Sequence, residues 1–342
     1  MEAIHIVGAG GIGCAVGHAL RRGGTRVVFV ENTEAKVAHG RRHGVAVEGQ
    51  GALPAEFVHF RDWEAPSAGV VLLCVKCPAN AAVLARVGSA SLIPIQNGVD
   101  AALAQRGPHV EGIASFVSEC PREQTHTRIT RRGDLHLGVH GASSPALRSQ
   151  VERLANQLGQ ASFRVRIVED IRPWKYTKLM YNSAISPLAA SAGLDNGELL
   201  RWPRLRGLFF ALLRENHAIL RHAGLPLEKV GPLHPATVAR ILARPWLAHL
   251  LAWAFYPSLR GTYCSMAPDL PDGPTEIANY NGHLVKLAGD LPCPLNRAVV
   301  SLVERMVAER LPPHPDRLEA LWTIELGRES VDLAGTDQRV AG

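Results

Sequence analysis

Residues 3–13, AIHIVGAGGIG, decide the fold of the amino-terminal half of the chain. The first part reads as a β-strand, and Gly8, Gly10 and Gly13 have G-x-G-x-x-G spacing at the start of a helix. In such a turn the first glycine permits the tight bend and the second admits a pyrophosphate close to the backbone. The third lets the helix pack closely on the sheet. The motif alone is weak evidence, but between a strand and a helix it predicts a dinucleotide-binding turn.

Short apolar runs rich in valine and isoleucine continue through the first half. They occupy residues 4–7, 27–30, 70–75, 92–95 and 113–117. Unbroken runs of this kind suit parallel strands that are covered on both faces. Helical stretches over residues 12–22 and 79–87 alternate with the strands. The sequence therefore predicts an α/β fold with an N-terminal Rossmann-type doubly wound sheet.

The second half is helical in pattern. Helices are expected over residues 174–192, 204–223, 235–255, 275–288 and 296–308, with glycine and proline in several of the turns. We expect a Rossmann domain over residues 1–168, an all-helical substrate-binding domain over residues 169–330 and a tail over residues 331–342. A cleft between two such domains would be a favoured ligand site.

Composition excludes several classes of protein. The 342 residues are 46% hydrophobic and 20% charged, as in globular rather than disordered chains. The net charge of +6 comes from scattered side chains, with no basic helix carrying interleaved aromatics, so nucleic-acid binding is not expected. No apolar run reaches the roughly 18 residues that span a bilayer. The amino terminus lacks the features of a signal peptide, so we expect a cytoplasmic protein.

The six cysteines are irregularly spaced, as suits a reducing compartment. Cys74 and Cys77 have the spacing of a redox pair or of half a zinc site. However, no second pair follows them, and Cys74 lies in a buried-strand pattern. A structural role is the simpler interpretation, and no metal site is expected.

An acidic residue ends the second predicted strand. Glu31 follows the glycine turn by about 20 residues, where a carboxylate accepts hydrogen bonds from the adenosine ribose. A carboxylate there would also repel the 2′-phosphate of NADP. Arg41 and Arg42 follow on the next helical stretch, where a solvated face is the simpler explanation and phosphate binding is the alternative.

A polar stripe runs along the predicted helix 174–192. Lys178, Asn182 and Ser186 are spaced i, i+4, i+8 and are flanked by apolar residues. Partial burial would lower the pKa of the lysine toward neutrality, which suits a proton donor to a carbonyl oxygen. On the pattern alone, a surface lysine whose stem covers apolar side chains is the alternative.

Other polar residues stand at turns. Thr262 and Ser265 belong to one cluster, Glu276 starts a probable helix, and Asn97 follows the fourth apolar run at the carboxyl edge of the sheet. Simpler interpretations are a helix cap for Thr275-Glu276 and an ordinary turn for Asn97-Gly98.

Taken together, these segments resemble the ketopantoate reductase family (2-dehydropantoate 2-reductases) from about residue 4 to about residue 305. The motifs occur in the family's order: Gly8–Gly13, Val75-Lys76, Gln96-Asn97-Gly98, Trp174–Asn182, Ser186-Pro187-Leu188, Asn196–Leu199, Ser265-Met266 with Asp269, and Thr275–Ile277 with Asn281-Gly282.

The resemblance implies a role for each matching position. Lys178 would be the catalytic lysine that protonates the C2 oxygen as hydride arrives, and Glu276 the active-site glutamate that supports it. The implied substrate-binding residues are Asn97, Asn182, Ser186, Thr262 and Ser265. The implied cofactor-binding residues are Gly8, Ala9, Gly10, Gly11, Ile12, Gly13, Glu31, Asn32, Lys76 and Asn97.

Three positions depart from the family pattern. Ser186 and Thr262 stand where asparagines are common, and Asn32 replaces an NADP-binding arginine. Glu31 favours NAD(H), whereas the resemblance favours NADP(H).

We expect reduction of a 2-oxo acid to a 2-hydroxy acid. One alternative is a bulkier carbonyl substrate, if the aromatics Trp246, Trp253 and Phe255 line the cleft rather than pack between helices. The other is a non-catalytic dinucleotide-binding redox sensor. The expected partner is a small-molecule substrate, and a homodimer is compatible with the sequence.

Overall fold

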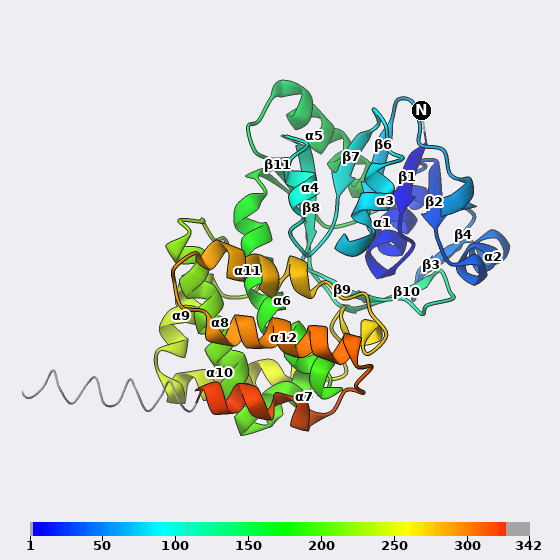
Figure 1. Cartoon of the computed structure of the whole chain (residues 1–342). Helices are drawn as coiled ribbons and strands as arrows, with labels where there is room; N and C mark the ends of the chain where they lie inside the picture. The colour runs from blue at the N-terminus through cyan, green and yellow to red at the C-terminus, as the bar shows by residue number, and fades with distance from the viewer. Residues whose placement is uncertain (1–2, 108, 326–342) are drawn as a thin grey trace, which may run out of the picture. The chain divides into compact units, whose positions relative to one another are not determined.

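The computed structural model describes residues 3–107 and 109–325 (Figure 1). The expected tail over residues 331–342 lies outside the described residues. The chain divides into two compact units, the first ending at Lys175 and the second starting at Tyr176. The division falls inside helix α6 (Arg172–Ala192) rather than after residue 168. The domain limits expected from the sequence remain a proposal, with this later division as the alternative.

The first unit is built on a parallel sheet with five strands, which confirms the Rossmann-type fold (Figure 1). In spatial order the strands are β5 (Glu56–His59), β2 (Val27–Glu31), β1 (Ile4–Val7), β6 (Val70–Leu73) and β7 (Ser91–Pro94). The predicted runs at residues 4–7, 27–30, 70–75 and 92–95 therefore all contain strands of this sheet.

Both faces of this sheet are buried, because the side chains of each strand alternate between two cores. Ile6 and Phe29 belong to one core, which also contains residues of α1 (Gly11–Arg22) and α5 (Pro145–Gly159). The other core takes the alternate strand residues together with α3 (Asn80–Leu84) and α4 (Ala101–Ala104). Burial on two sides explains why the strands read as unbroken apolar runs.

The fifth predicted strand is placed differently. The expected strand over residues 113–117 covers only the last two residues of β8 (His109–Ala114) and the first residue of β9 (Val117–Glu119). Strand β8 is antiparallel to β11 (Leu135–His140) in a separate sheet with β12 (Val165–Asp170). A single parallel bridge from Ile95 to Gly112 links β8 to the end of β7. The buried Glu111 interrupts the apolar pattern of β8, so the apolar run starts later than the strand does.

A small sheet and helix α2 (Glu34–His43) complete the first unit. The sheet has the strand order β4 (Gly51–Leu53), β3 (Val45–Val47), β10 (His126–Arg131) and β9 (Val117–Glu119).

The described part of the second unit is all helical, as expected. Its α-helices after α6 are α7 (Asn196–Arg201), α8 (Pro203–His222), α9 (Pro235–Leu242), α10 (Pro245–Leu259), α11 (Asn281–Ala288) and α12 (Pro294–Ala308).

Two helix predictions need correction. The expected helix over residues 235–255 is two helices, α9 and α10, because Pro245 cannot donate a backbone hydrogen bond and Arg244 before it is extended. The expected helix over residues 275–288 begins instead with a short 3-10 turn at Ile277–Asn279, and the α-helix starts only at Asn281.

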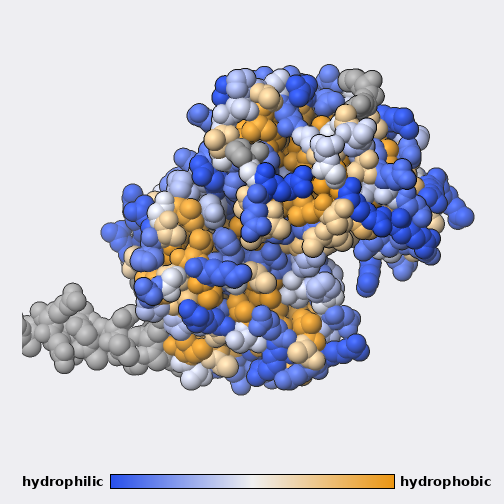
Figure 2. Space-filling view, turned by 45° about the horizontal axis from the view of Figure 1, so that its top comes forward, coloured by the Kyte–Doolittle hydropathy of each residue, from blue (hydrophilic) through white to orange (hydrophobic). Residues whose placement is uncertain are grey.

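Among the described residues, no helix is both long enough and apolar enough to cross a membrane. On the face drawn in Figure 2, apolar side chains reach the surface as separate patches among hydrophilic ones.

Candidate functional site

The glycine loop joins β1 to α1 and is closed against the sheet but open at its middle. Gly8 has φ +102°, and a Cβ on it would lie 2.8 Å from the carbonyl carbon of Cys74. A Cβ on Gly13 would lie 2.0 Å from the Gly8 oxygen. At Gly10, by contrast, a Cβ would have none of the described atoms within 4 Å. Gly10 starts the helix without a side-chain cap from the described residues. The open backbone at Gly10, at the start of the helix, therefore fits the close approach of a pyrophosphate.

The carboxylate of Glu31 lies beside this loop. Its Oε2 atom accepts a hydrogen bond from the Ala9 backbone N–H at 3.1 Å, and its Oε1 atom accepts from the Asn32 N–H at 2.8 Å. The Asn32 side chain is exposed, and its oxygen accepts from the hydroxyl of Thr33 at 3.3 Å. A fixed negative charge therefore stands at the end of β2, where a ribose would be expected.

The positively charged side chains near Glu31 either bind backbone carbonyls or are exposed. Arg41 donates from Nε to the Phe57 carbonyl at 2.9 Å, so its guanidinium is bound to β5, and Arg42 is exposed. Lys36, which the sequence analysis missed, is buried and donates from Nζ to the Ala9 carbonyl at 3.1 Å. The sequence gives no signal that distinguishes a buried lysine in a short helix from a lysine on a solvated face.

Lys76 and Asn97 follow β6 and β7, so they lie at the same carboxyl edge of the sheet as the glycine loop. Both side chains are half-buried. Gln96 and Asn80 exchange two side-chain hydrogen bonds of 2.7 Å and 3.1 Å, and Gln96 also donates to the Val75 carbonyl at 2.5 Å. These bonds tie the loop after β7 to the loop after β6. Asn80 stands in no motif that pointed to it from the sequence.

Neither Cys74 nor Cys77 forms a disulfide with a described residue. Burial raises the pKa of Cys74 to about 12, so the thiol stays protonated and unreactive. This supports the structural interpretation of the pair.

In the second unit, helix α6 carries the polar stripe. Lys178 and Asn182 are half-buried, whereas Ser186 is buried. Leu179 and Met180 beside them are also buried. The helix therefore presents two polar side chains, one turn apart, on a body that is otherwise well packed.

Pro187 lies inside α6 and has no N–H to donate to the Ser183 carbonyl one turn earlier. Asn281 supplies the missing bond, because its Nδ2 donates to that carbonyl at 2.9 Å. Asn281 also donates to Asn296, which in turn donates to Glu215 at 3.0 Å. This buried network, which the sequence analysis missed, supports the helix that carries Lys178.

A chain of hydrogen bonds joins Ser265 to Glu276. The Tyr280 hydroxyl donates to Glu276 Oε2 at 3.3 Å and lies 3.4 Å from the Ser265 hydroxyl. Glu276 and Tyr280 are both buried. Two expected site residues thus meet through a tyrosine that the sequence analysis did not single out. Its position four residues after Glu276 was the available signal.

Thr262 is buried and its hydroxyl already has two partners. It donates to the Leu259 carbonyl at 2.6 Å and accepts from Asn196 Nδ2 at 3.2 Å. These bonds fix the chain after α10, and binding of substrate by Thr262 stays a prediction. On α10 itself, Trp246 and Trp253 are 63% and 78% exposed, so they do not pack between helices as the simpler interpretation assumed.

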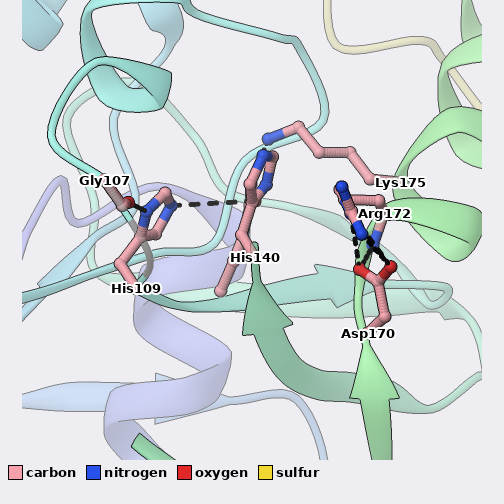
Figure 3. Close-up of polar contacts among 7 residues, drawn as sticks. Gly107, His109, His140, Asp170, Arg172 and Lys175 are labelled. Atoms are coloured by element: carbon pink, nitrogen blue, oxygen red, sulfur yellow. Dashed lines mark hydrogen bonds and ion pairs between the residues drawn. The ribbon is translucent and has the colours of Figure 1, made fainter. Parts of the chain in front are cut away.

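A buried polar cluster lies beside the start of α6 in the first unit. Figure 3 shows the side chains of His109 and His140 next to each other, with Lys175 reaching toward them. The two rings stack with centroids 5.1 Å apart. Glu111 is buried beside them, accepts from His140 Nδ1 at 2.8 Å and forms an ion pair with Lys175. Burial by itself would raise the pKa of Glu111, but Lys175 and then His140 lower it to about 2.

The same cluster has metal-ligand chemistry. Atoms of His109, Glu111 and His140 lie within 4.8 Å of one another, a separation that could hold a metal ion. However, the ammonium of Lys175 already balances the carboxylate, and a divalent ion would leave uncompensated positive charge in a buried place. We therefore assign the cluster a structural role, in which Glu111 of β8 anchors the first turn of α6.

Comparisons with known proteins agree along most of the chain. The family described as "Ketopantoate reductase PanE/ApbA" matches residues 4–141, and "Ketopantoate reductase PanE/ApbA C terminal" matches residues 170–307. A 2-dehydropantoate 2-reductase of Archaeoglobus fulgidus is 25% identical over 312 residues, covering 89% of this chain and 97% of that protein. One of Pyrobaculum aerophilum is 25% identical, covering 88% and 96%.

Solved structures share the fold at low identity. D-mandelate dehydrogenase, solved with NADH and anilino(oxo)acetate, superposes with a TM-score of 0.72 at 16% identity, covering 90% of this chain and 99% of that one. A PanE/ApbA family ketopantoate reductase from Ralstonia eutropha also gives a TM-score of 0.72, at 22% identity, with coverage of 90% and 99%.

Proposed function

This chain belongs to the ketopantoate reductase family, and from that premise we propose that it reduces a 2-oxo acid to a 2-hydroxy acid with Lys178 as the general acid. The family establishes the coarser activity, an NAD(P)-dependent oxidoreductase that interconverts a keto acid and its alcohol. The proposal concerns the residues that carry the reaction, the choice of cofactor and the substrate.

The observation that carries the proposal is the arrangement on α6. Lys178 is half-buried one helical turn before Asn182, on a helix held by the network around Asn281. The bound nicotinamide supplies the hydride. Lys178 gives its proton to the substrate's C2 oxygen, and its positive charge stabilises the negative charge that develops on that oxygen.

The remaining polar residues of the second unit would bind and orient the substrate. Glu276 holds Tyr280, and Tyr280 reaches Ser265, so the three form a fixed row of acceptors and donors. Preorganised groups of this kind avoid the entropic cost of ordering flexible side chains during the reaction. Asn182, next along α6, would bind the substrate beside Lys178.

For the cofactor, we infer a preference for NADH. The Glu31 carboxylate is fixed at the glycine loop, where it would accept hydrogen bonds from ribose hydroxyls and repel a 2′-phosphate. Arg41 is bound to β5, and Lys36 is committed to the Ala9 carbonyl. The neighbour solved with NADH is a protein of this fold that holds that cofactor.

For the substrate, we infer a 2-oxo acid other than ketopantoate. Every 2-oxo acid has the carbonyl and carboxylate that Lys178, Asn182 and Ser265 would bind. The positions that differ from the family pattern, Ser186 and Thr262, lack the paired donor and acceptor of asparagine. The Thr262 hydroxyl moreover already donates to the Leu259 carbonyl and accepts from Asn196. A site with fewer groups for a terminal hydroxyl discriminates less in its favour.

A homodimer also stays a proposal; a dimeric ketopantoate reductase is known from Staphylococcus aureus.

A non-catalytic redox sensor is the alternative function that the sequence left open. The experiment that separates enzyme from sensor is steady-state oxidation of NADH by a set of branched, aromatic and long-chain 2-oxo acids, with ketopantoate included. Turnover of any member supports the enzyme. Binding of NADH without turnover of any member of the set would support the sensor.

A further inference from the structure

Two thiols from distant parts of the first unit converge on the glycine loop. Cys14 is buried in α1, and Cys120 is half-buried directly after β9, before an exposed turn at residues 121–124. Their Sγ atoms lie 3.1 Å and 3.9 Å from one atom, the carbonyl oxygen of Ala9. The fold therefore places side by side two cysteines that lie in separate elements.

A buried cation completes the cluster. The Nζ atom of Lys36 lies 3.1 Å from the same Ala9 oxygen and 4.0 Å from Cys120 Sγ. A positive charge at this distance stabilises a thiolate, which is the reactive form of cysteine. The side chains of Cys14, Cys120 and Lys36 thus surround the backbone of the loop that would hold the dinucleotide.

The surroundings make the two thiols unequal. The neighbouring Cys14 thiol, and after it the charge of Lys36, lowers the pKa of Cys120. The neighbouring Cys120 sulfur, together with burial, raises the pKa of Cys14. The half-buried thiol is therefore the stronger acid of the two and ionises first, and the buried thiol beside it is the weaker acid. In contrast, burial raises the pKa of Cys264 as well as that of Cys74.

We propose that Cys120 is an oxidation site for hydroperoxides, that Cys14 resolves the oxidised form to a disulfide, and that this disulfide weakens dinucleotide binding. The Cys120 thiolate attacks a peroxide oxygen, the O–O bond breaks, a sulfenic acid forms and hydroxide leaves. The Cys14 sulfur then attacks the Cys120 sulfur and loses its proton, the S–O bond breaks and water leaves. In total, two thiols and one hydrogen peroxide give one disulfide and two waters, and a dithiol reductant reverses the change.

The link to the glycine loop is direct. Cys14 now donates its S–H to the Ala9 carbonyl, and a disulfide removes that donor. The strand before Cys120 also touches the loop, because a Cβ on Gly11 would lie 2.5 Å from the Ser118 carbonyl oxygen. Drawing the two sulfurs into a covalent bond therefore shifts backbone around Ala9 and Gly11. This inference rests on the proposed use of that loop to bind the pyrophosphate.

The experiment treats the purified protein with hydrogen peroxide and compares it with the reduced protein. Peptide mass spectrometry reads the linkage, and a fluorescence titration gives the Kd for NADH. We expect a Cys14–Cys120 disulfide and NADH binding weaker by about tenfold or more, the scale of losing one or two hydrogen bonds to a charged phosphate. A dithiol should restore the original Kd.

Variants make the test specific. Cys120→Ser and Cys14→Ser should keep their NADH affinity after peroxide, whereas the control Cys293→Ser, in the other unit, should respond like the unchanged protein. Lys36→Met should slow alkylation of Cys120 by iodoacetamide about tenfold near neutral pH, through loss of thiolate.

Oxidation of Cys120 without linkage to Cys14, or a disulfide that leaves the Kd unchanged, would overturn the proposal. These outcomes are independent of the substrate. If the reduced protein binds NADH but turns over no 2-oxo acid, the proposed function fails. The disulfide and the Kd for NADH can still be measured, so the proposal about the two thiols is tested separately.

Discussion

The carboxylate of Glu31 accepts a hydrogen bond from the backbone N–H of Ala9 at 3.1 Å. This bond joins the end of the second strand to the middle of the glycine loop. It also fixes a negative charge at the place where the adenosine ribose would lie in the proposed binding mode, and only NADP carries a 2′-phosphate on that ribose.

We expect NADH to be preferred over NADPH by at least about tenfold in kcat/KM, the factor that corresponds to roughly 1.4 kcal/mol. Glu31→Gln should narrow this preference by lowering the KM for NADPH, because the amide keeps an acceptor for the Ala9 N–H and removes the charge. The measurement is steady-state kinetics with both cofactors. Glu48→Gln, which removes an exposed carboxylate elsewhere in the unit, serves as the matched control. A native protein that prefers NADPH would show that Glu31 does not set the choice.

The buried ion pair between Glu111 and Lys175 should matter for stability. Lys175→Met leaves the buried carboxylate bonded to His140 but without the ammonium that balances its charge, which costs up to about 3–5 kcal/mol in the free energy of unfolding. The double variant Lys175→Met, Glu111→Gln should lose much less than the sum of the single changes, because no unpaired charge remains. Chemical denaturation of the four proteins measures this coupling. Additive losses would mean that the two side chains do not interact.

The same pair predicts a pH dependence. The pKa of Glu111 is lowered to about 2. The stabilisation that the ionised Glu111 adds to the free energy of unfolding is therefore fully present above the ordinary pKa of a glutamate and is lost as pH falls toward about 2. The unchanged protein should therefore lose up to about 3 kcal/mol more than Glu111→Gln between about pH 5 and pH 2. Denaturation curves across this window provide the test, and parallel losses in the two proteins would argue against a lowered pKa.

Asn281 and Pro187 should be coupled through the Ser183 carbonyl. Asn281→Ala leaves that carbonyl and Asn296 each short of a donor, a loss of about 1–3 kcal/mol in unfolding free energy. Adding Pro187→Ala provides an N–H for the same carbonyl, so the double variant should recover part of the loss. If Pro187→Ala gives the same change with and without Asn281, the bond to Ser183 is not what Asn281 contributes.

Much of the fold was predictable from the sequence, because its signals are local. Gly8, Gly10 and Gly13 bear out the glycine turn, since the Cβ positions of Gly8 and Gly13 are blocked and that of Gly10 is open. The parallel strands read as apolar runs because both faces are buried. Strands β3 and β4 have only three residues each, too few for a period to show. The break at Pro245 could have been predicted from the missing N–H.

Residues of the candidate site could be predicted only where they stand in a sequence motif. Lys178 and Glu276 stand in motifs, and their chemical roles stay predictions. Lys36 and Tyr280 acquire their partners through tertiary contacts with Ala9 and Glu276, which no local pattern encodes. The same reason hides the pairing of Cys14 with Cys120, which are brought together only by the fold.

Substrate preference is tested by a panel. We expect kcat/KM for ketopantoate to fall below that for at least one branched, aromatic or long-chain 2-oxo acid, because Ser186 and Thr262 supply fewer groups for a terminal hydroxyl. If ketopantoate leads the panel with an efficiency above about 10⁴ M⁻¹s⁻¹, the hypothesis of another substrate is wrong.

The most direct test of the central claim is the kcat of Lys178→Ala with the best 2-oxo acid of that panel, measured together with the Kd for NADH. Lys286→Ala, which removes an exposed lysine of α11, is the matched control. We predict that Lys178→Ala lowers kcat by about 10²–10⁴-fold, the range for removing a positioned general acid, while the Kd for NADH stays unchanged. A Lys178→Ala protein that binds NADH normally and retains near-full turnover would contradict the account.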